Sequence, residues 1–250
     1  KPRENLSILE LGCGSGPLGA EMIDWGYSVE FSDYSDVLIE RLRKEFGYKA
    51  FTADCRDLSF AKDNSYDVIL LAGTVYNFEN YYSAEKVYGE INRILKPDGL
   101  FLASLFGNET LKELKYSLYI AESKLTNKVV PSIPSFLNIQ QTGSLLQNTG
   151  FNLPVVDKDI IKIFYKDIFD LMQDIKLMGG NNNFIGRKKI SMSNKIFNMA
   201  NKIYKKKFSK VNKIYATYEI LYLIGWKKHS SQQKPKKPWS ATRSLSEVLS

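Results

Sequence analysis

Residues 10–16 form a glycine-rich turn, Glu10-Leu11-Gly12-Cys13-Gly14-Ser15-Gly16. The turn ends the short apolar run Ser7–Leu11, and the helical segment after it begins with Pro17, a residue favoured in the first turn of a helix. Glycine adopts positive φ angles without strain and lets a ligand approach the backbone closely. A strand, a glycine-rich turn and a helix in this order predict a nucleotide-binding βα unit.

The same alternation continues to residue 107. Apolar runs suited to strands occur at residues 7–11, 28–33, 49–54, 66–71 and 100–106, and amphipathic helical segments separate most of them. This order predicts βαβ units, and therefore a parallel sheet with right-handed crossovers. Residues 1–107 are expected to form an α/β core that binds the nucleotide.

The pattern changes after Gly107. Helices are expected near residues 111–120 and 145–148 and over 167–178 and 193–208, and strands over 155–165 and 216–226. We assign residues 108–226 to the same domain, as its remaining strands plus a helical insertion. Residues 227–250 are polar and are expected to form a surface tail.

Two aspartates end neighbouring strands of the predicted core. Carboxyl ends of parallel strands meet at the edge where open α/β sheets bind ligands, so Asp33 can accept ribose hydroxyl groups and Asp54 can meet an adenine edge. The turn contains no lysine, which excludes a phosphate-binding P-loop. Pro17 departs from the dinucleotide-binding pattern, although Gly16 and Gly19 leave that alternative open.

The turn resembles motif I of the class I S-adenosylmethionine-dependent methyltransferases, and so do the strand Tyr66–Ile69 and the Lys96–Gly99 turn. The resemblance implies a Rossmann-like class I methyltransferase fold, a mostly parallel seven-stranded sheet with an antiparallel last strand. It implies that Glu10 helps to hold the methionine end of S-adenosylmethionine. The cofactor-binding residues expected on this basis are Glu10, Gly12, Cys13, Gly14, Gly16, Asp33, Tyr34, Asp54, Cys55 and Ala72.

The second half carries a closer resemblance. Its distinctive stretches are Ala103–Gly107 with Glu109–Leu114, Ala216–Ile220 with Ile224–Trp226, then His229, Ser231, Gln232 and Ser240-Ala241. They look like the complex I assembly factor 5 family and its bacterial relatives. The resemblance implies an enzyme that hydroxylates an arginine of an iron–sulfur-containing peripheral-arm subunit of NADH:ubiquinone oxidoreductase. It implies the matrix side of the mitochondrial inner membrane in a eukaryote, and we expect the cytoplasm in a bacterium.

Hydroxylation normally requires a metal or flavin that activates oxygen. A two-histidine, one-carboxylate iron site is impossible, because His229 is the single histidine. His229 follows the predicted antiparallel strand, so we expect it to lie away from the ligand edge and to make local contacts. No metal is assigned, and the catalytic residues are left open. Tyr76, Phe78 and Tyr81 are candidates for an aromatic rim over the substrate, with core packing as the alternative.

The formal charge of +8 favours an anionic partner. We expect a protein client and no nucleic acid, while the basic surface also allows peripheral contact with an anionic membrane. Two alternatives stay open. One is a methyltransferase acting on a small molecule or on a carrier protein, and the other is a non-catalytic assembly chaperone that holds the cofactor for stability. The oligomeric state is not determined by the sequence.

Overall fold

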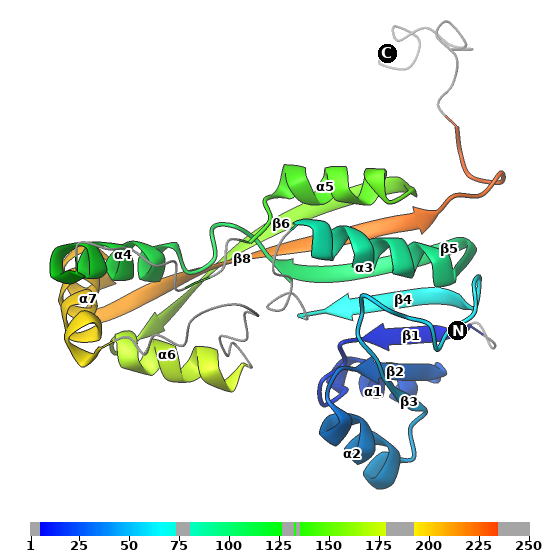
Figure 1. Cartoon of the computed structure of the whole chain (residues 1–250), viewed down its shortest axis with the longest axis horizontal. Coiled ribbons are helices and arrows are strands. Elements are labelled where there is room, and N and C mark those ends of the chain that lie inside the picture. Colours follow the sequence, from blue (N-terminus) through cyan, green and yellow to red (C-terminus); the bar gives the residue numbers. More distant parts are fainter. Residues whose placement is uncertain (1–5, 74–80, 127–132, 134–135, 179–192, 235–250) are drawn as a thin grey trace, which may run out of the picture.

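The computed structural model describes residues 6–73, 81–126, 133, 136–178 and 193–234. These fold around one sheet with the strand order β3-β2-β1-β4-β5-β8-β6 (Figure 1). The strands on this path are β1 (Ile8–Leu11), β2 (Val29–Asp33), β3 (Ala50–Thr52), β4 (Tyr66–Ala72), β5 (Leu95–Phe106), β6 (Phe151–Tyr165) and β8 (Lys213–Lys227).

The neighbours from β3 to β5 pair in parallel, whereas β8 runs antiparallel to both β5 and β6. The short strand β7 (Ser209–Lys210) adds a hairpin to β8. The predicted fold is therefore confirmed: a mostly parallel α/β sheet of seven strands, extended by one two-residue strand, with the antiparallel strand last in sequence.

Local signals set the helix boundaries. Gly16 precedes α1 (Pro17–Asp24), and the Ser35 side chain accepts a hydrogen bond from Leu38 N–H at the start of α2 (Asp36–Phe46). Gly47 ends α2 with φ at 68°, a conformation that suits glycine. The later helices are α3 (Tyr81–Ile94), α4 (Lys112–Thr126), α5 (Ile139–Asn148), α6 (Ile168–Leu177) and α7 (Asn194–Lys207). None of the helices in the described ranges is long and apolar enough to cross a membrane.

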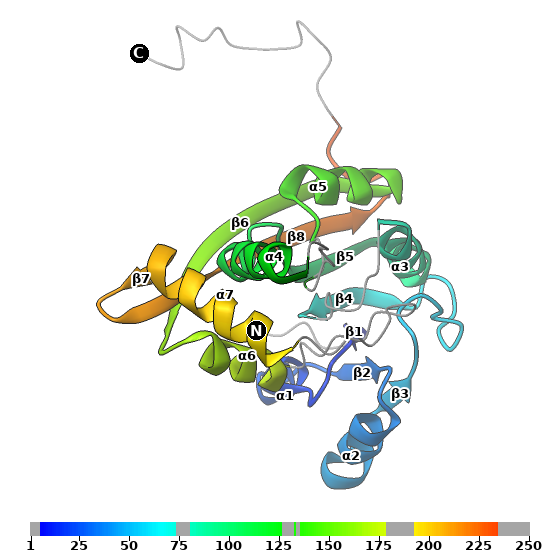
Figure 2. The same ribbon diagram turned by 60° about the vertical axis from the view of Figure 1, so that its left-hand side comes forward.

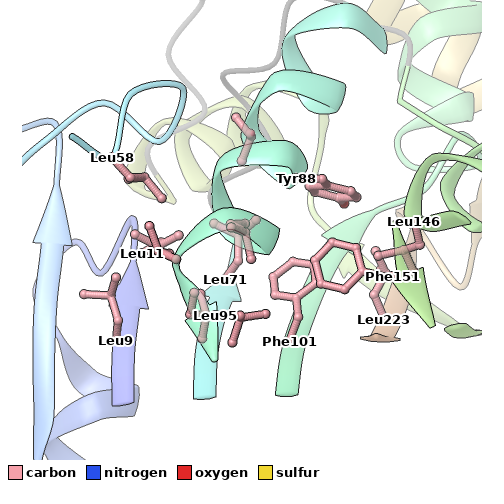
Figure 3. Close-up of a cluster of buried hydrophobic side chains, with 14 of the residues drawn as sticks. Leu9, Leu11, Leu58, Leu71, Tyr88, Leu95, Phe101, Leu146, Phe151 and Leu223 are labelled. Atoms are coloured by element: carbon pink, nitrogen blue, oxygen red, sulfur yellow. The ribbon is translucent and has the colours of Figure 1, made fainter. Parts of the chain in front are cut away.

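Alternate residues of the central strands pack on opposite faces of the sheet. Leu9 and Leu11 of β1 join a cluster with side chains of α3 and α5, and Ile8 joins a second cluster with side chains of α1 and α2. Figure 3 shows the first cluster, in which Tyr88 of α3 lies over Phe101 of β5. Both faces are covered, which agrees with the nearly continuous apolar runs in the sequence.

One predicted boundary is wrong. The sequence predicts this strand over residues 100–106 with a turn at Lys96–Gly99 before it, but β5 already begins at Leu95. Leu95 pairs with Tyr66, the register then shifts, and Leu100 pairs with Val68. The strand therefore contains an irregular segment in which Asp98 adopts φ of 64°. The sequence signal for a turn was correct locally, but pairing with β4 on both sides made this segment part of the strand.

Helices α4, α6 and α7 pack with the outer ends of β6 and β8 around a separate hydrophobic cluster. We call this part the cap lobe. Figures 1 and 2 show it beyond the carboxyl ends of β1 and β4, on the side to which those strands point. Strands β6 and β8 run through both the core and the cap lobe, and so connect them.

The chain between β5 and α4 is not a strand, but its backbone still forms hydrogen bonds with β8. Gly107 N–H and Leu111 N–H donate to the carbonyl groups of Glu219 and Thr217, at 2.8 and 2.7 Å. The Glu113 carboxylate accepts Thr217 N–H at 3.0 Å and also the Thr217 hydroxyl. These contacts join the two stretches Glu109–Leu114 and Ala216–Ile220, which lie far apart in the sequence.

Candidate functional site

The glycine turn lies at the carboxyl end of β1. Gly12, Gly14 and Gly16 have φ angles of 61°, 57° and 76°. Other residues rarely adopt this region, so the local backbone requires these glycines. Gly16 N–H donates to the Cys13 carbonyl at 2.8 Å, which closes the turn directly before α1.

Asp33 connects the turn to the second strand. Its carboxylate accepts Gly14 N–H at 2.8 Å and Ser35 N–H at 2.9 Å. A carboxylate has about four acceptor positions. Asp33 therefore fixes both the turn and the start of α2 and still has acceptor capacity for the hydroxyl groups of a ribose.

Glu10 contacts the helix that follows the turn. The side chain is 3% exposed, and its Oε2 accepts Gly19 N–H at 2.9 Å. Burial raises the pKa of Glu10 to about 7, although the Gly19 hydrogen bond acts in the opposite direction. A Cβ at Gly19 would lie 2.4 Å from the Phe31 ring and 2.5 Å from the Glu10 carboxylate, so this approach needs glycine. The contact ties Glu10 to α1, and its predicted role at the methionine end stays a prediction.

Asp54 lies further from its strand than the sequence indicated. The third strand ends at Thr52, and Asp54 follows two residues later in a bridge with Asp57. Arg56 Nη2 lies 2.6 Å from Asp54 Oδ2, and its hydrogen bonds hold the pKa of Asp54 below its usual range. An adenine amino group would therefore share this carboxylate with Arg56. Nothing in the sequence indicated this pairing except the closeness of the two residues.

The two cysteines are packing residues. Cys13 is 5% exposed and joins the cluster formed with α1 and α2, and Cys55 packs against the opposite cluster. Burial raises the pKa of each thiol to about 12. Both thiols are therefore protonated near neutral pH, and neither is suited to act as a nucleophile.

The remaining predicted positions follow the same edge. Tyr34 is 78% exposed directly after Asp33, and Ala72 is the last residue of β4. Tyr81 begins α3, while Tyr76 and Phe78 lie outside the described residues. The structure thus brings the cofactor-binding candidates together at the carboxyl ends of β1, β2 and β4 and just beyond β3. Gly19 and Arg56 were not predicted, and their places depend on side-chain contacts.

His229 lies at the opposite edge of the sheet. It follows the end of β8, where Trp226 pairs with Leu100 near the beginning of the regular part of β5. Its ring Nδ1 lies 2.7 Å from the Ser231 hydroxyl. The expectation of a local contact away from the ligand edge is confirmed. Within the described ranges, no three His, Cys, Asp or Glu side chains come together as a metal-binding group.

Comparison with known proteins agrees with this geometry. Residues 8–99 match the family model described as a methyltransferase domain. The fold is similar to the YcgJ protein of Bacillus subtilis, with a TM-score of 0.61 and 15% identity over 91% of this chain and 94% of the other. A methyltransferase-like protein of Bacillus halodurans gives a TM-score of 0.60 at 14% identity, with the same coverage. Residues 8–99 are thus similar to methyltransferase domains, and the whole described fold is similar to that of these solved structures.

Relatives with similar sequences extend the match to the second half. The human mitochondrial arginine-hydroxylase NDUFAF5 is 32% identical over 99% of this chain and 71% of its own length. The Dictyostelium discoideum protein of that name is 43% identical over 65% of this chain, a match that spans 37% of its length. A malonyl-[acyl-carrier protein] O-methyltransferase of Methylovorus is 27% identical over 88% of this chain and 75% of its length. With the fold and the site already in agreement, this chain belongs to the arginine-hydroxylase NDUFAF5 family.

Proposed function

We propose that this chain binds S-adenosylmethionine at the carboxyl edge of its sheet and modifies an arginine side chain of a protein client. The contact between Gly14 N–H and Asp33 carries the proposal. It joins the glycine turn to a carboxylate with free acceptor capacity, the arrangement that a ribose-bearing ligand needs. The NDUFAF5 relatives are named arginine-hydroxylases, and this name is the reason for proposing arginine as the modified residue.

The described residues fit the cofactor. Asp33 would accept the ribose hydroxyls, the backbone of Gly12–Gly16 would adjoin the methionine end, and Asp54 with Cys55 would adjoin the adenine. When bound, S-adenosylmethionine supplies an activated methyl group. The chain's own residues hold the glycine turn in place for the cofactor. Glu10 holds α1 against the turn through Gly19, and Asp33 holds the turn against α2.

We propose that the protein client binds at the end of the sheet where the cap lobe lies. The described residues up to 107 would supply the cofactor site, and those between 108 and 226 would complete the same domain, with the cap lobe beyond the edge where the cofactor would lie. The client that the family resemblance implies is a peripheral-arm subunit of complex I. In a eukaryote the matrix face of the mitochondrial inner membrane would be the place of action, since the relatives are named mitochondrial.

The test of cofactor binding is calorimetric titration of S-adenosylmethionine into the wild type, Asp33→Ala and Asp36→Ala. Asp33→Ala removes a charge-assisted acceptor worth ~1.5–3 kcal/mol, so its affinity should fall at least about tenfold. Asp36 is an exposed carboxylate on the neighbouring helix, so its removal should leave the affinity near wild type. Equal affinities in all three proteins, or no binding to the folded wild type, would refute the proposed site.

The test of the reaction is mass spectrometry of the client after incubation with the enzyme. Addition of one oxygen atom to an arginine supports hydroxylation, and addition of a methyl group supports transfer from the cofactor. The similarity to malonyl-[acyl-carrier protein] O-methyltransferases makes carrier-protein methylation the second candidate. Methylation of a malonyl carrier protein, with no change in the complex I subunit, would favour that candidate over the first.

A further inference from the structure

Residues 193–213 carry an unusual concentration of positive charge. The stretch covers α7, β7 and the turn into β8 and contains seven lysines with no arginine and no acidic residue, against a net charge of +8 for the whole chain. All seven lysines are exposed. None of them forms an ion pair with a carboxylate of the described residues.

Three of these lysines form a ridge along α7. Lys195, Lys202 and Lys206 follow the spacing i, i+7, i+11, which places them on one side of a helix. The opposite side carries Ile196, Ala200 and Tyr204, which are buried in the cluster of the cap lobe. The packing of α7 therefore fixes the ridge toward solvent.

Helix α4 adds tyrosines next to the carboxyl end of α7. Figures 1 and 2 both show α4 next to α7. Tyr116 and Tyr119 on α4 are 38% and 55% exposed, and the Lys207 ammonium lies 3.8 Å from the centre of the Tyr116 ring. We call this surface the lysine–tyrosine face; its residues are Lys195, Lys202, Lys205, Lys206 and Lys207 of α7 with Tyr116 and Tyr119 of α4.

We propose that the lysine–tyrosine face docks an acidic surface of the protein client, which rests on the proposed function. Unpaired lysines attract and orient an acidic partner over long range, and tyrosines supply the contact area that protein interfaces favour. The face belongs to the cap lobe, beyond the carboxyl ends of β1 and β4. A partner held there would lie on the side of the sheet to which the carboxyl ends of β1 and β4 point, the side that also carries Asp33.

The same observations argue against other anionic partners. A helix that lies in a lipid surface exposes a broad apolar face. Helix α7 buries its apolar side within the protein and exposes no large hydrophobic side chain. Nucleic-acid recognition relies strongly on the guanidinium group, and this stretch contains no arginine.

The experiment compares two triple variants with equal loss of charge. Lys195→Gln, Lys202→Gln and Lys206→Gln together remove the ridge, whereas Lys62→Gln, Lys228→Gln and Lys234→Gln remove three exposed lysines from other parts of the chain. Labelled poly-L-glutamate is the acidic polypeptide probe, and anisotropy reports binding. We expect the ridge variant to bind roughly tenfold more weakly and the control variant to remain near wild type, with the difference shrinking at high salt.

Two further probes decide the class of partner. Vesicles that contain phosphatidylglycerol, and polyuridylate, should show no selective loss in the ridge variant. Equal weakening of poly-L-glutamate binding by both triple variants would overturn the proposal, as would a selective loss confined to the vesicles or the RNA. Titration of S-adenosylmethionine into the ridge variant should give the wild-type affinity. Failure of cofactor binding in the wild type would instead count against the proposed function.

Discussion

At the scale of single residues, the site depends on a buried carboxyl group beneath a glycine turn. Glu10 lies among apolar neighbours, accepts Gly19 N–H, and has Phe31 packed close to the same glycine. Burial of a charged carboxylate is unfavourable, and this is the main reason that its pKa rises to about 7. The turn is thus held by a group whose protonation changes near physiological pH.

This pKa predicts a pH dependence of stability. The ordinary pKa of a glutamate is 4.5, so between that value and about 7 the folded protein binds the Glu10 proton more tightly than the unfolded chain. The free energy of unfolding should therefore fall as the pH rises through this range, by at most ~3 kcal/mol from this group, and level off above it. Glu10→Gln should remove that part of the slope and raise the stability at pH values above about 7.

Urea unfolding across this pH range measures the effect. Glu21→Gln is the matched control, because Glu21 is an exposed glutamate on α1, the helix that Glu10 contacts. The control should follow the wild-type profile. A Glu10→Gln profile parallel to that of the wild type would show that Glu10 does not titrate in this range.

At the scale of elements, the Glu113 side chain supplies a hydrogen-bond acceptor to β8 beyond the point where strand β5 ends. Beyond Phe106 no residue of β5 faces β8, and the Glu113 carboxylate accepts Thr217 N–H instead. Glu113 is 2% exposed and belongs to α4, so this contact fixes the first turn of the helix to the sheet. Gly107 allows the nearby Glu219 side chain to approach, since a Cβ there would lie 2.4 Å from its carboxylate.

Glu113→Ala should leave a buried N–H group without its acceptor, at a cost of ~1–3 kcal/mol in the free energy of unfolding. Glu113→Gln retains an amide oxygen that can accept the same hydrogen, so its loss should be smaller. Lys124→Ala, an exposed change on the same helix, should stay within about 0.5 kcal/mol of wild type. Chemical denaturation gives all three values, and equal stability of Glu113→Ala and Lys124→Ala would contradict the assigned role.

At the scale of the whole molecule, two long strands connect the core and the cap lobe. Strands β6 and β8 are 15 residues each and contribute to both parts. The two parts share one sheet, because the strand ends that pack in the cap lobe belong to β6 and β8, whose other ends lie in the core. We therefore expect the described molecule to unfold as one cooperative unit.

Leu114→Ala tests this expectation. Leu114 is 1% exposed in the cap lobe, and its truncation should cost ~2–5 kcal/mol. Native-state hydrogen exchange should then show faster exchange in β4 of the core as well as in α7. Leu125→Ala makes the same substitution at a position on α4 that is 44% exposed, and should change little. Faster exchange confined to the cap lobe would show two separate units.

The sequence by itself determined the elements whose signals are local. The glycine turn, the cap at Ser35, the stop at Gly47 and the alternation of strands and helices depend on neighbouring residues, and together they predicted the parallel core and the position of Asp33. The carboxyl-edge site follows from that order, because parallel strands direct their ends to one side.

Only the tertiary structure decided the contacts between distant segments. The pairing of Glu113 with Thr217, the support of Gly19 by Glu10 and Phe31, and the capture of Lys96–Gly99 within β5 each depend on packing that no local pattern specifies. The lysine–tyrosine face is of the same kind, since its charge is visible in the sequence but its tyrosines come from another helix. Local signals act over a few residues, whereas these contacts depend on how the completed sheet places its neighbours.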